Sequence, residues 1–403
     1  MAKWWMGVTL VGVVLGLPVA ARAQYLPSGP GPKPMPEPVP CAPNGSTIPG
    51  PLNPIMAPPG PPDELSLPAN HSSAFQCPEY AEHNPVYVYL GSLAYQRPRP
   101  DHGQVVFQDP ALRGLDTGIR PIRQADLNND VQDYDMLVPQ MAFGVAATIG
   151  YQVGDCALEA TGFYVPRSNT HVDTVRQGRL DLNFFNPPLG FEGDNGLWLQ
   201  ADRVRTTLGT TLASGELNLR YIDKAFAGVE PLIGVRYLNV QEDLSIYTGD
   251  DDQAFLDING HPDPTRQATY TIHTNNNIVA GQLGLELQYP VCCWLCLGGF
   301  AKGAWGWDLF QKTTTLTRGD GFLGFDERTH HDQFAHVYEL GCYLDFYILE
   351  QLRLRGGYNV MWVVNVPEAI SQVNFDLANP NTFQKDNGSI FFHGPIVQLQ
   401  FLF

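Results

Sequence analysis

Three groups of residues in this sequence have side chains that could do chemistry. His330-His331-Asp332 places two imidazoles beside a carboxylate, a combination that can activate water for hydrolysis. Cys293 and Cys296 have the CxxC spacing of redox and zinc sites, but no second CxxC and no suitably spaced histidine pair accompanies them. GxSxG, Walker and HExxH motifs are absent from the sequence. We therefore expect no enzymatic activity, no metal site and no cofactor.

The third group consists of charged residues at alternate positions of short apolar segments. Within residues 215–221, Glu216 and Arg220 alternate with Leu217, Leu219 and Tyr221. Successive side chains of a β-strand point to opposite faces, so such a segment has one polar and one apolar face. The same alternation along the chain gives twelve candidate charges on polar faces, seven acidic and five basic: Glu159, Glu216, Arg220, Glu230, Arg236, Glu286, Lys302, Asp308, Glu339, Asp345, Arg353 and Arg355.

Ten such segments are predicted as β-strands. They lie near residues 86–95, 140–152, 155–165, 211–222, 227–240, 277–289, 294–310, 334–348, 351–363 and 389–403. The connections after the second, fourth, sixth and eighth strands are very short, whereas the other five run from roughly 23 to 45 residues. Short turns at one end and long loops at the other are typical of a transmembrane β-barrel.

We therefore expect residues 85–403 to form an all-β fold, a closed antiparallel transmembrane β-barrel of about ten strands with long extracellular loops. Eight to twelve strands are compatible with the pattern. The apolar faces would meet outer-membrane lipid. Basic side chains in mid-membrane cost about 2–4 kcal/mol each on the lipid face, so the twelve charges are expected to face the lumen. The final strand alternates Leu399, Phe401 and Phe403, which resembles the C-terminal signal read by the barrel assembly machinery.

The N-terminus indicates export. A positive start, an apolar stretch and Ala21-Arg22-Ala23 predict a signal peptide over residues 1–23, cleaved after Ala23. Residues 24–84 read as a largely disordered linker, since residues 25–70 hold 16 of the 34 prolines. With ten strands, both chain ends fall on the short-turn side. The linker is therefore expected in the periplasm of a bacterium with an outer membrane, where peptidoglycan is a candidate partner.

Composition agrees with this interpretation. Charged residues make up only 16% of the chain, and the formal net charge is −17. An acidic chain with few Lys and Arg residues does not favour nucleic acid as a partner. The low charged fraction is explained if one face of every strand meets lipid.

Several segments resemble the Putative beta-barrel porin-7 family of bacterial outer-membrane proteins. The resemblance rests on residues 90–95 (LGSLAY), 277–284 (NIVAGQLG), 301–305 (AKGAW), 354–362 (LRGGYNVMW) with Pro367-Glu368 beyond, and 388–394 (GSIFFHG). It covers most of residues 86–403, but not the proline-rich segment or the loops around 100–135 and 168–210. The resemblance implies an outer-membrane barrel and brings no catalytic or binding residues with it.

Two functions remain open from the sequence. The first is a porin-like barrel that passes small solutes or organises the envelope. The second is a non-conducting barrel that displays long surface loops for adhesion or assembly. Eight strands leave an interior just wide enough for side chains, while open channels need 16–18, so ten strands lie closer to a filled lumen. Disulfide pairing also remains open among seven cysteines: Cys41, Cys77, Cys156, Cys292, Cys293, Cys296 and Cys342.

Overall fold

The fold is known from a computed structural model. It describes residues 86–100, 104–108, 130–192, 197–222, 228–250, 260–261, 263–292, 294–349, 351–380, 382 and 388–403. The predicted signal peptide and the proline-rich linker lie outside the described residues.

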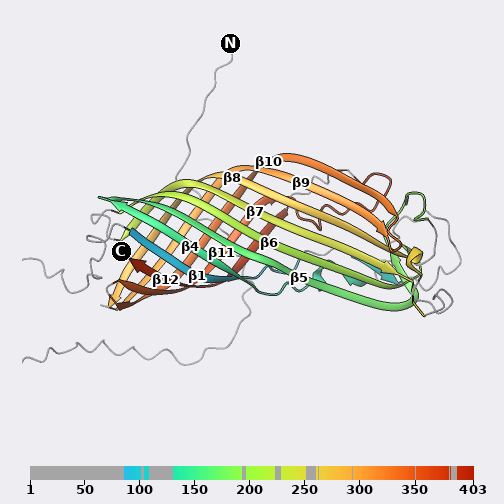
Figure 1. The fold of residues 1–403 in the computed structure, drawn as a ribbon, viewed down its shortest axis with the longest axis horizontal. Coiled ribbons are helices and arrows are strands. Elements are labelled where there is room, and N and C mark those ends of the chain that lie inside the picture. Colours follow the sequence, from blue (N-terminus) through green and yellow to red (C-terminus); the bar gives the residue numbers. More distant parts are fainter. Residues whose placement is uncertain are drawn as a thin grey trace, which may run out of the picture. The chain divides into compact units, whose positions relative to one another are not determined.

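Ten antiparallel strands form a closed ring in the order β5-β4-β1-β12-β11-β10-β9-β8-β7-β6, and β6 pairs again with β5. Their bounds are β1 (Val86–Tyr95), β4 (Ala142–Val153), β5 (Cys156–Leu182), β6 (Ala201–Tyr221), β7 (Val229–Gly249), β8 (Gln267–Cys292), β9 (Leu295–Arg318), β10 (Leu323–Leu349), β11 (Leu352–Val366) and β12 (Gly388–Leu402). The predicted closed antiparallel barrel of about ten strands is confirmed (Figure 1).

Four smaller elements lie outside the ring. Strand β2 (Gln104–Gln108) pairs with the far end of β5, and β3 (Asp130–Asp133) pairs with β2. The 3-10 helices are η4 (Tyr134–Met136) and η7 (Pro264–Arg266). Across the described parts of the chain, no helix has the length and hydropathy needed to span a membrane.

The first and last strands close the ring at the end that carries the short turns. Strands β1 and β12 pair from Tyr87↔Leu402 to Leu93↔Ile396, and the N–H of Phe403 donates to the carbonyl of Val86. The β4–β5 turn at this end is only Gly154-Asp155, and Gly154 has a φ of +58°, a left-handed conformation that suits glycine. The start of β1 and the C-terminus therefore lie at the same end of the barrel (Figure 1).

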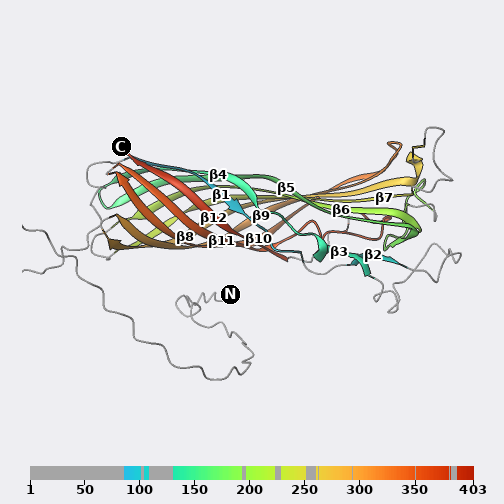
Figure 2. The same cartoon turned by 90° about the horizontal axis from the view of Figure 1, so that it is seen from below.

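Six strands are longer than predicted at the opposite end. Strands β5 to β10 continue well past the ends of β1, β4, β11 and β12 (Figures 1 and 2). The predicted loop of residues 311–333 is wrong, because β9 runs to Arg318, β10 starts at Leu323, and a four-residue turn joins them. These extensions were missed because their outward residues are mainly polar, such as Thr313 and Thr315, so they lack the apolar face by which strands were recognised.

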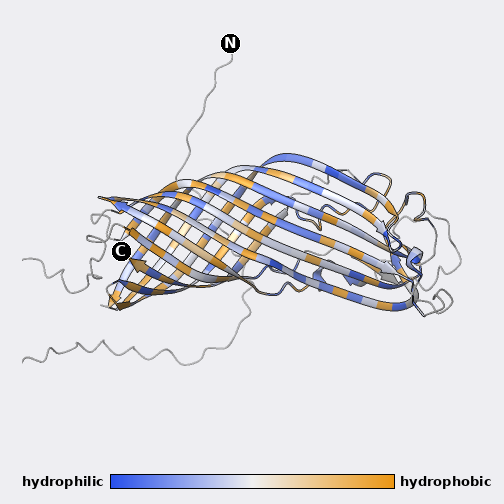
Figure 3. Ribbon diagram, in the orientation of Figure 1, coloured by the Kyte–Doolittle hydropathy of each residue, from blue (hydrophilic) through white to orange (hydrophobic). Residues whose placement is uncertain are grey.

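The outer surface divides into two zones along the strands. In the half of the barrel that carries the short turns and the C-terminus, outward side chains are apolar and exposed, for example Phe143 at 69% and Leu283 at 50%. In the far part of the long strands, outward side chains become polar, as in the far part of β10 (Figure 3). We call the first zone the apolar band. An exposed apolar belt closed around a β-barrel is the surface expected to contact lipid.

The interior is packed in layers. A middle apolar cluster includes Leu238, Met361 and Phe392, and a far cluster includes Phe184, Trp198 and Tyr270. Residues 183–192 and 197–200 of the β5–β6 connection and residues 367–380 of the β11–β12 connection fold into the far cluster. There Phe184 packs against Trp198, Tyr270 and Phe375 at ring-centroid distances of 4.9, 4.9 and 5.4 Å. Side chains therefore fill the long-strand half of the barrel as they would fill a globular core.

Candidate functional site

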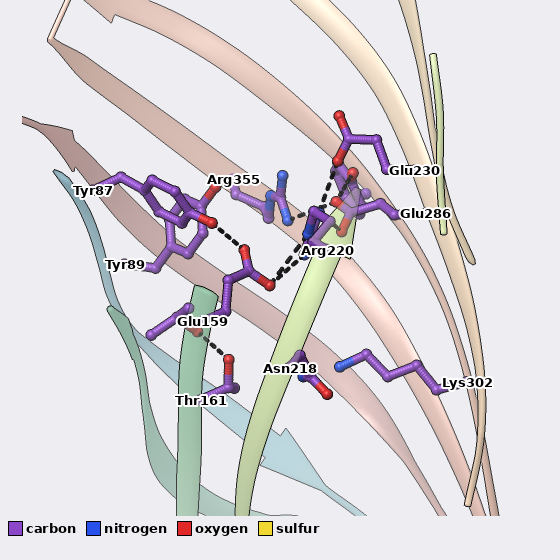
Figure 4. Close-up of polar contacts among 12 residues, drawn as sticks. Tyr87, Tyr89, Glu159, Thr161, Asn218, Arg220, Glu230, Glu286, Lys302 and Arg355 are labelled. Atoms are coloured by element: carbon purple, nitrogen blue, oxygen red, sulfur yellow. Dashed lines mark hydrogen bonds and ion pairs between the residues drawn. The ribbon is translucent and has the colours of Figure 1, made fainter. Parts of the chain in front are cut away.

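The candidate site is the charged interior beside the short-turn end of the barrel. Its centre is Arg220, an inward residue near the end of β6. The guanidinium donates from Nη2 to Glu159 Oε2 (2.8 Å) and from Nη1 to Glu230 Oε2 (3.0 Å), and it also pairs with Glu286. Figure 4 shows these carboxylates converging on Arg220 from three other strands, β5, β7 and β8. One cation thus joins three carboxylates.

A second arginine, Arg355 of β11, extends this arrangement. It makes a bidentate pair with Asp345, with Nε–Oδ1 at 2.7 Å and Nη2–Oδ2 at 2.8 Å, and its Nη1 lies 3.5 Å from Glu286 Oε1. The guanidinium also stacks over the Tyr343 ring, 3.6 Å from the centroid. Arg220, Arg355, Glu159, Glu230, Glu286 and Asp345 together form what we call the lower network.

Two tyrosines complete the lower network, and two glycines leave space for them. The hydroxyl of Tyr87 donates to Glu159, and that of Tyr343 donates to Glu286. A Cβ placed on Gly150 would come within 2.0 Å of the Tyr87 ring, and one on Gly298 within 2.1 Å of the Tyr343 ring. Each tyrosine therefore depends on a neighbouring strand that has no side chain at that point.

A second set of charges, the upper network, lies next to the lower one along the barrel. Arg236 of β7 pairs with Glu339 (Nη1–Oε2, 2.7 Å) and with Glu216 (Nη2–Oε1, 3.5 Å), and Lys302 Nζ lies 2.9 Å from Glu216 Oε2. Gln282 Nε2 donates to Glu216 Oε2 at 2.9 Å. Strands β8 and β9 separate β7 from β10, so the Arg236–Glu339 pair crosses the interior and does not follow the wall.

The two networks account for ten of the twelve predicted charges. Arg353 instead donates to the Tyr347 hydroxyl at 3.2 Å and lies over that ring. Asp308 is fully buried and accepts a long hydrogen bond from Gln333 Nε2 (3.5 Å). The ion pairs within the two networks are required physically, because an ion buried without a partner is strongly destabilising.

A further interior set of charged residues, centred on Arg97, was not found from the sequence. Arg97 pairs with Glu242 and Glu368, and Glu242 Oε2 also accepts from the N–H of Ala369 at 2.9 Å. Arg97 follows β1 in a connection, and Glu242 lies beyond the predicted strand 227–240, so strand alternation was not applied to either. These contacts fix the start of the 367–382 connection inside the barrel.

The side chains of His330, His331 and Asp332 do not converge on one site. Residues 330–332 lie within β10, where successive side chains alternate, so His331 points away from the face that His330 and Asp332 share. A different pair does form on the polar outer surface, where His273 Nδ1 lies 2.6 Å from Asp243 Oδ1. That hydrogen bond raises the pKa of His273 and lowers that of Asp243. Arg167 also contacts Asp243, with Nη1–Oδ2 at 3.0 Å.

The remaining sequence candidates are distributed around the barrel. Cys156, Cys292 and Cys342 have free thiols, and Cys296 is buried. Cys41, Cys77 and Cys293 lie outside the described residues. In the described ranges no three His, Cys, Asp or Glu side chains lie close enough to hold a metal ion. Leu399 of β12 and Phe403, directly after β12, are exposed, while Gln398 and Gln400 on either side of Leu399 are buried.

Comparison with known families supports the resemblance predicted from the sequence. The model of the family described as Putative beta barrel porin-7 matches residues 199–389, which confirms the resemblance over that part of the chain. No curated protein matches the sequence.

Several solved structures are similar to this chain. They include the outer membrane protease OmpT from Escherichia coli (12% identity, 83% of this chain and 99% of that chain, TM-score 0.37). The translocator domain of the autotransporter NalP from Neisseria meningitidis matches at 11% identity, over 80% of this chain and 90% of its own, with a TM-score of 0.37. The P. putida toluene transporter TodX matches at 10% identity, over 79% and 90%, with a TM-score of 0.30.

Proposed function

We propose that this outer-membrane β-barrel, which matches the porin-7 family model over residues 199–389, is a sealed barrel that passes no solute current and holds a rigid structure outside the membrane. The observation that carries the proposal is the Arg236–Glu339 pair, which crosses the interior at 2.7 Å. A hydrated ion or small solute would have to separate this pair. Separating buried, paired charges costs several kcal/mol, which opposes conduction.

Packing beyond the upper network supports the same function. The middle apolar cluster, with Leu238, Met361 and Phe392, lies along the interior next to the charges. The far cluster includes residues 184, 191, 197 and 198 of the β5–β6 connection and residues 369, 373 and 377 of the β11–β12 connection. A solute would therefore meet two ionic networks and two apolar layers in series, and neither type of layer offers a continuous aqueous path.

The long halves of β5 to β10 support a role in surface display. They extend past the apolar band, and their outward residues are polar, so we place them outside the membrane. The short turns would then face the periplasm, together with the proline-rich segment 24–84 after cleavage at Ala23. In this orientation the segment could reach peptidoglycan, and the terminal strand with Leu399, Phe401 and Phe403 would be read by the barrel assembly machinery.

The porin function is the second candidate, and the family description favours it. It requires the ionic networks to open. Swelling of vesicles in isotonic solutions of small sugars separates the two functions. Vesicles that contain the folded barrel are expected to swell no faster than empty vesicles. Swelling that depends on solute size would overturn the sealed-barrel proposal in favour of the porin.

A further inference from the structure

Five basic side chains lie together on the outer surface of the far half, over strands β5, β6 and β8. They are Arg167, His171, Arg203, Arg205 and His273, and we call them the basic strip. On the outward faces of residues 167–175, 203–209, 241–247 and 267–275, the carboxylates are Asp173 and Asp243. Three arginines therefore face two carboxylates, in a chain whose formal net charge is −17. The excess of positive charge is local to this part of the surface.

The upper part of the basic strip is two arginines that share one carboxylate. Asp173 Oδ1 accepts from Arg203 Nε at 2.9 Å, and Asp173 Oδ2 accepts from Arg205 Nη2 at 2.7 Å. The Asp173 side chain is 24% exposed, against 35% for Arg203 and 44% for Arg205, so the carboxylate lies beneath the two cations. Within the described part of the chain, Arg205 donates through Nη2 alone. A guanidinium has five N–H donors, so Arg205 can bind a further acceptor from outside.

The lower part is Arg167, whose position depends on a glycine in the neighbouring strand. Its guanidinium crosses β6 at Gly209, where an added Cβ would lie 2.5 Å from Arg167 Nε. Arg167 Nη1 reaches Asp243 Oδ2 on β7 at 3.0 Å, and His273 contacts the other oxygen of that carboxylate. The Arg167 side chain is still 50% exposed. Ion pairs that water reaches contribute about 0–1 kcal/mol, so stability alone does not account for this group of charges.

The height of the basic strip above the apolar band indicates what it could contact. Tyr164, which is more than half exposed in the band, precedes Arg167 by three residues on β5. From Arg167 to Asp173 the strand extends about 20 Å at about 3.3 Å per residue, which is about 15 Å along the membrane normal at the usual tilt. A phospholipid headgroup layer is only about 5–7 Å deep. The strip therefore reaches beyond phospholipid headgroups, to the level of sugars that a glycolipid carries above its acyl chains.

We propose that the basic strip binds the phosphate groups of a phosphorylated glycolipid of the lipopolysaccharide type in the outer leaflet. The acyl chains pack against the apolar band, and phosphates on the sugars accept hydrogen bonds from Arg167 and Arg205. Arginine suits this role because its planar fork donates several hydrogen bonds to one phosphate. The proposal rests on the proposed placement of the far half outside the membrane, and it does not depend on whether the barrel conducts.

Native mass spectrometry of the full-length protein in nonionic detergent tests the proposal. The probe is rough lipopolysaccharide with a phosphorylated inner core, and a chelator removes divalent ions that could bridge it to the aspartates. The comparison ligands are the same glycolipid after dephosphorylation with hydrofluoric acid, and phosphatidylglycerol. The variant combines Arg167→Gln with Arg205→Gln. Arg328→Gln is the matched control, because Arg328 is an exposed outward arginine of β10 outside the strip, in the ladder row that runs through Thr313 to His273.

The parent protein is expected to bind the phosphorylated glycolipid about tenfold more tightly than either comparison ligand, because hydrogen bonds between charged groups are the stronger ones. The double variant is expected to lose this preference, and Arg328→Gln is expected to keep it. In the parent, which needs no variant to fold, the preference should weaken as the concentration of ammonium acetate is raised, since salt screens exposed charges. Equal binding of the dephosphorylated glycolipid, equal binding of phosphatidylglycerol, an equal loss in Arg328→Gln or a preference unaffected by salt would each overturn the proposal.

Discussion

Arg236 on β7 and Glu339 on β10 form an ion pair across the interior of the barrel, with Nη1 and Oε2 2.7 Å apart. Strands β8 and β9 lie between them in the wall. The pair therefore ties together two strands that are three positions apart in the ring. Its position next to the middle apolar cluster makes it the contact on which the proposed sealing of the barrel depends most directly.

Removing one partner of this pair should strongly destabilise the barrel. Arg236→Ala leaves Glu339 buried without its cation, and loss of one partner of a buried pair costs about 3–5 kcal/mol. The free energy of unfolding in vesicles, measured by urea titration, checks this. The control is Arg203→Ala, because Arg203 is also paired on a strand but is partly exposed, and ion pairs that water reaches contribute about 0–1 kcal/mol. Equal losses in the two variants would contradict the account of the upper network.

The stability of the barrel should also depend on the space that glycines leave for the inward tyrosines. Gly298→Ala would place a Cβ against the Tyr343 ring and disturb its hydrogen bond to Glu286. We expect a loss of about 1–3 kcal/mol in unfolding free energy, as for other overpacked cores. Gly281→Ala is the matched control, since nothing lies within 4 Å of its added Cβ. A neutral Gly298→Ala would show that Tyr343 does not need its observed position.

The limits of the apolar band can be measured on a single strand. Leu283 and Thr271 both lie on the outward face of β8, twelve residues apart. Leu283→Arg should cost about 2–4 kcal/mol in lipid vesicles, and Thr271→Arg about 0–1 kcal/mol, because only the first introduces a charge into hydrocarbon. Similar costs at both sites would contradict the proposed position of the membrane.

The pair of His273 and Asp243 should make stability depend on pH in a defined window. The pKa of His273 is raised, so its contribution is complete below the ordinary histidine value of about 6.5 and is lost as pH rises through the raised value. The pKa of Asp243 is lowered, so its contribution is present above about 3.9 and is lost as pH falls through the lowered value. The pair should therefore stabilise most between about pH 4 and 6.5.

Comparing the parent with His273→Gln at several pH values measures this contribution. The difference in unfolding free energy should stay below about 1 kcal/mol, because both side chains are partly exposed, and it should shrink above neutral pH. A difference that grows with rising pH would contradict the assignment.

Strand alternation predicted a large part of the barrel. It gave ten strands, and it selected twelve charged residues of which ten join the two networks. Alternation requires only that one face of each strand differ from the other, and this information is local. It failed for the far halves of β5 to β10, because Thr313 and similar outward residues face neither lipid nor a core and so give no apolar face.

The partners of the charges could not be predicted in the same way. Arg220 contacts residues from three other strands, and Arg236 reaches Glu339 across the interior. Such contacts depend on the order of the strands around the ring and on their relative shift, which no short stretch of sequence encodes. Arg97 was missed for a related reason, since it lies in a connection whose course depends on the packed interior around Glu242 and Glu368.

Single-channel recording in planar lipid bilayers tests the central claim most directly. The folded protein is expected to produce no current steps, because the Arg236–Glu339 pair and the apolar layers beside it close the interior. Its folded state is checked by its resistance to unfolding in detergent. Reproducible current steps from the parent protein would contradict the sealed barrel and assign it the function of a porin.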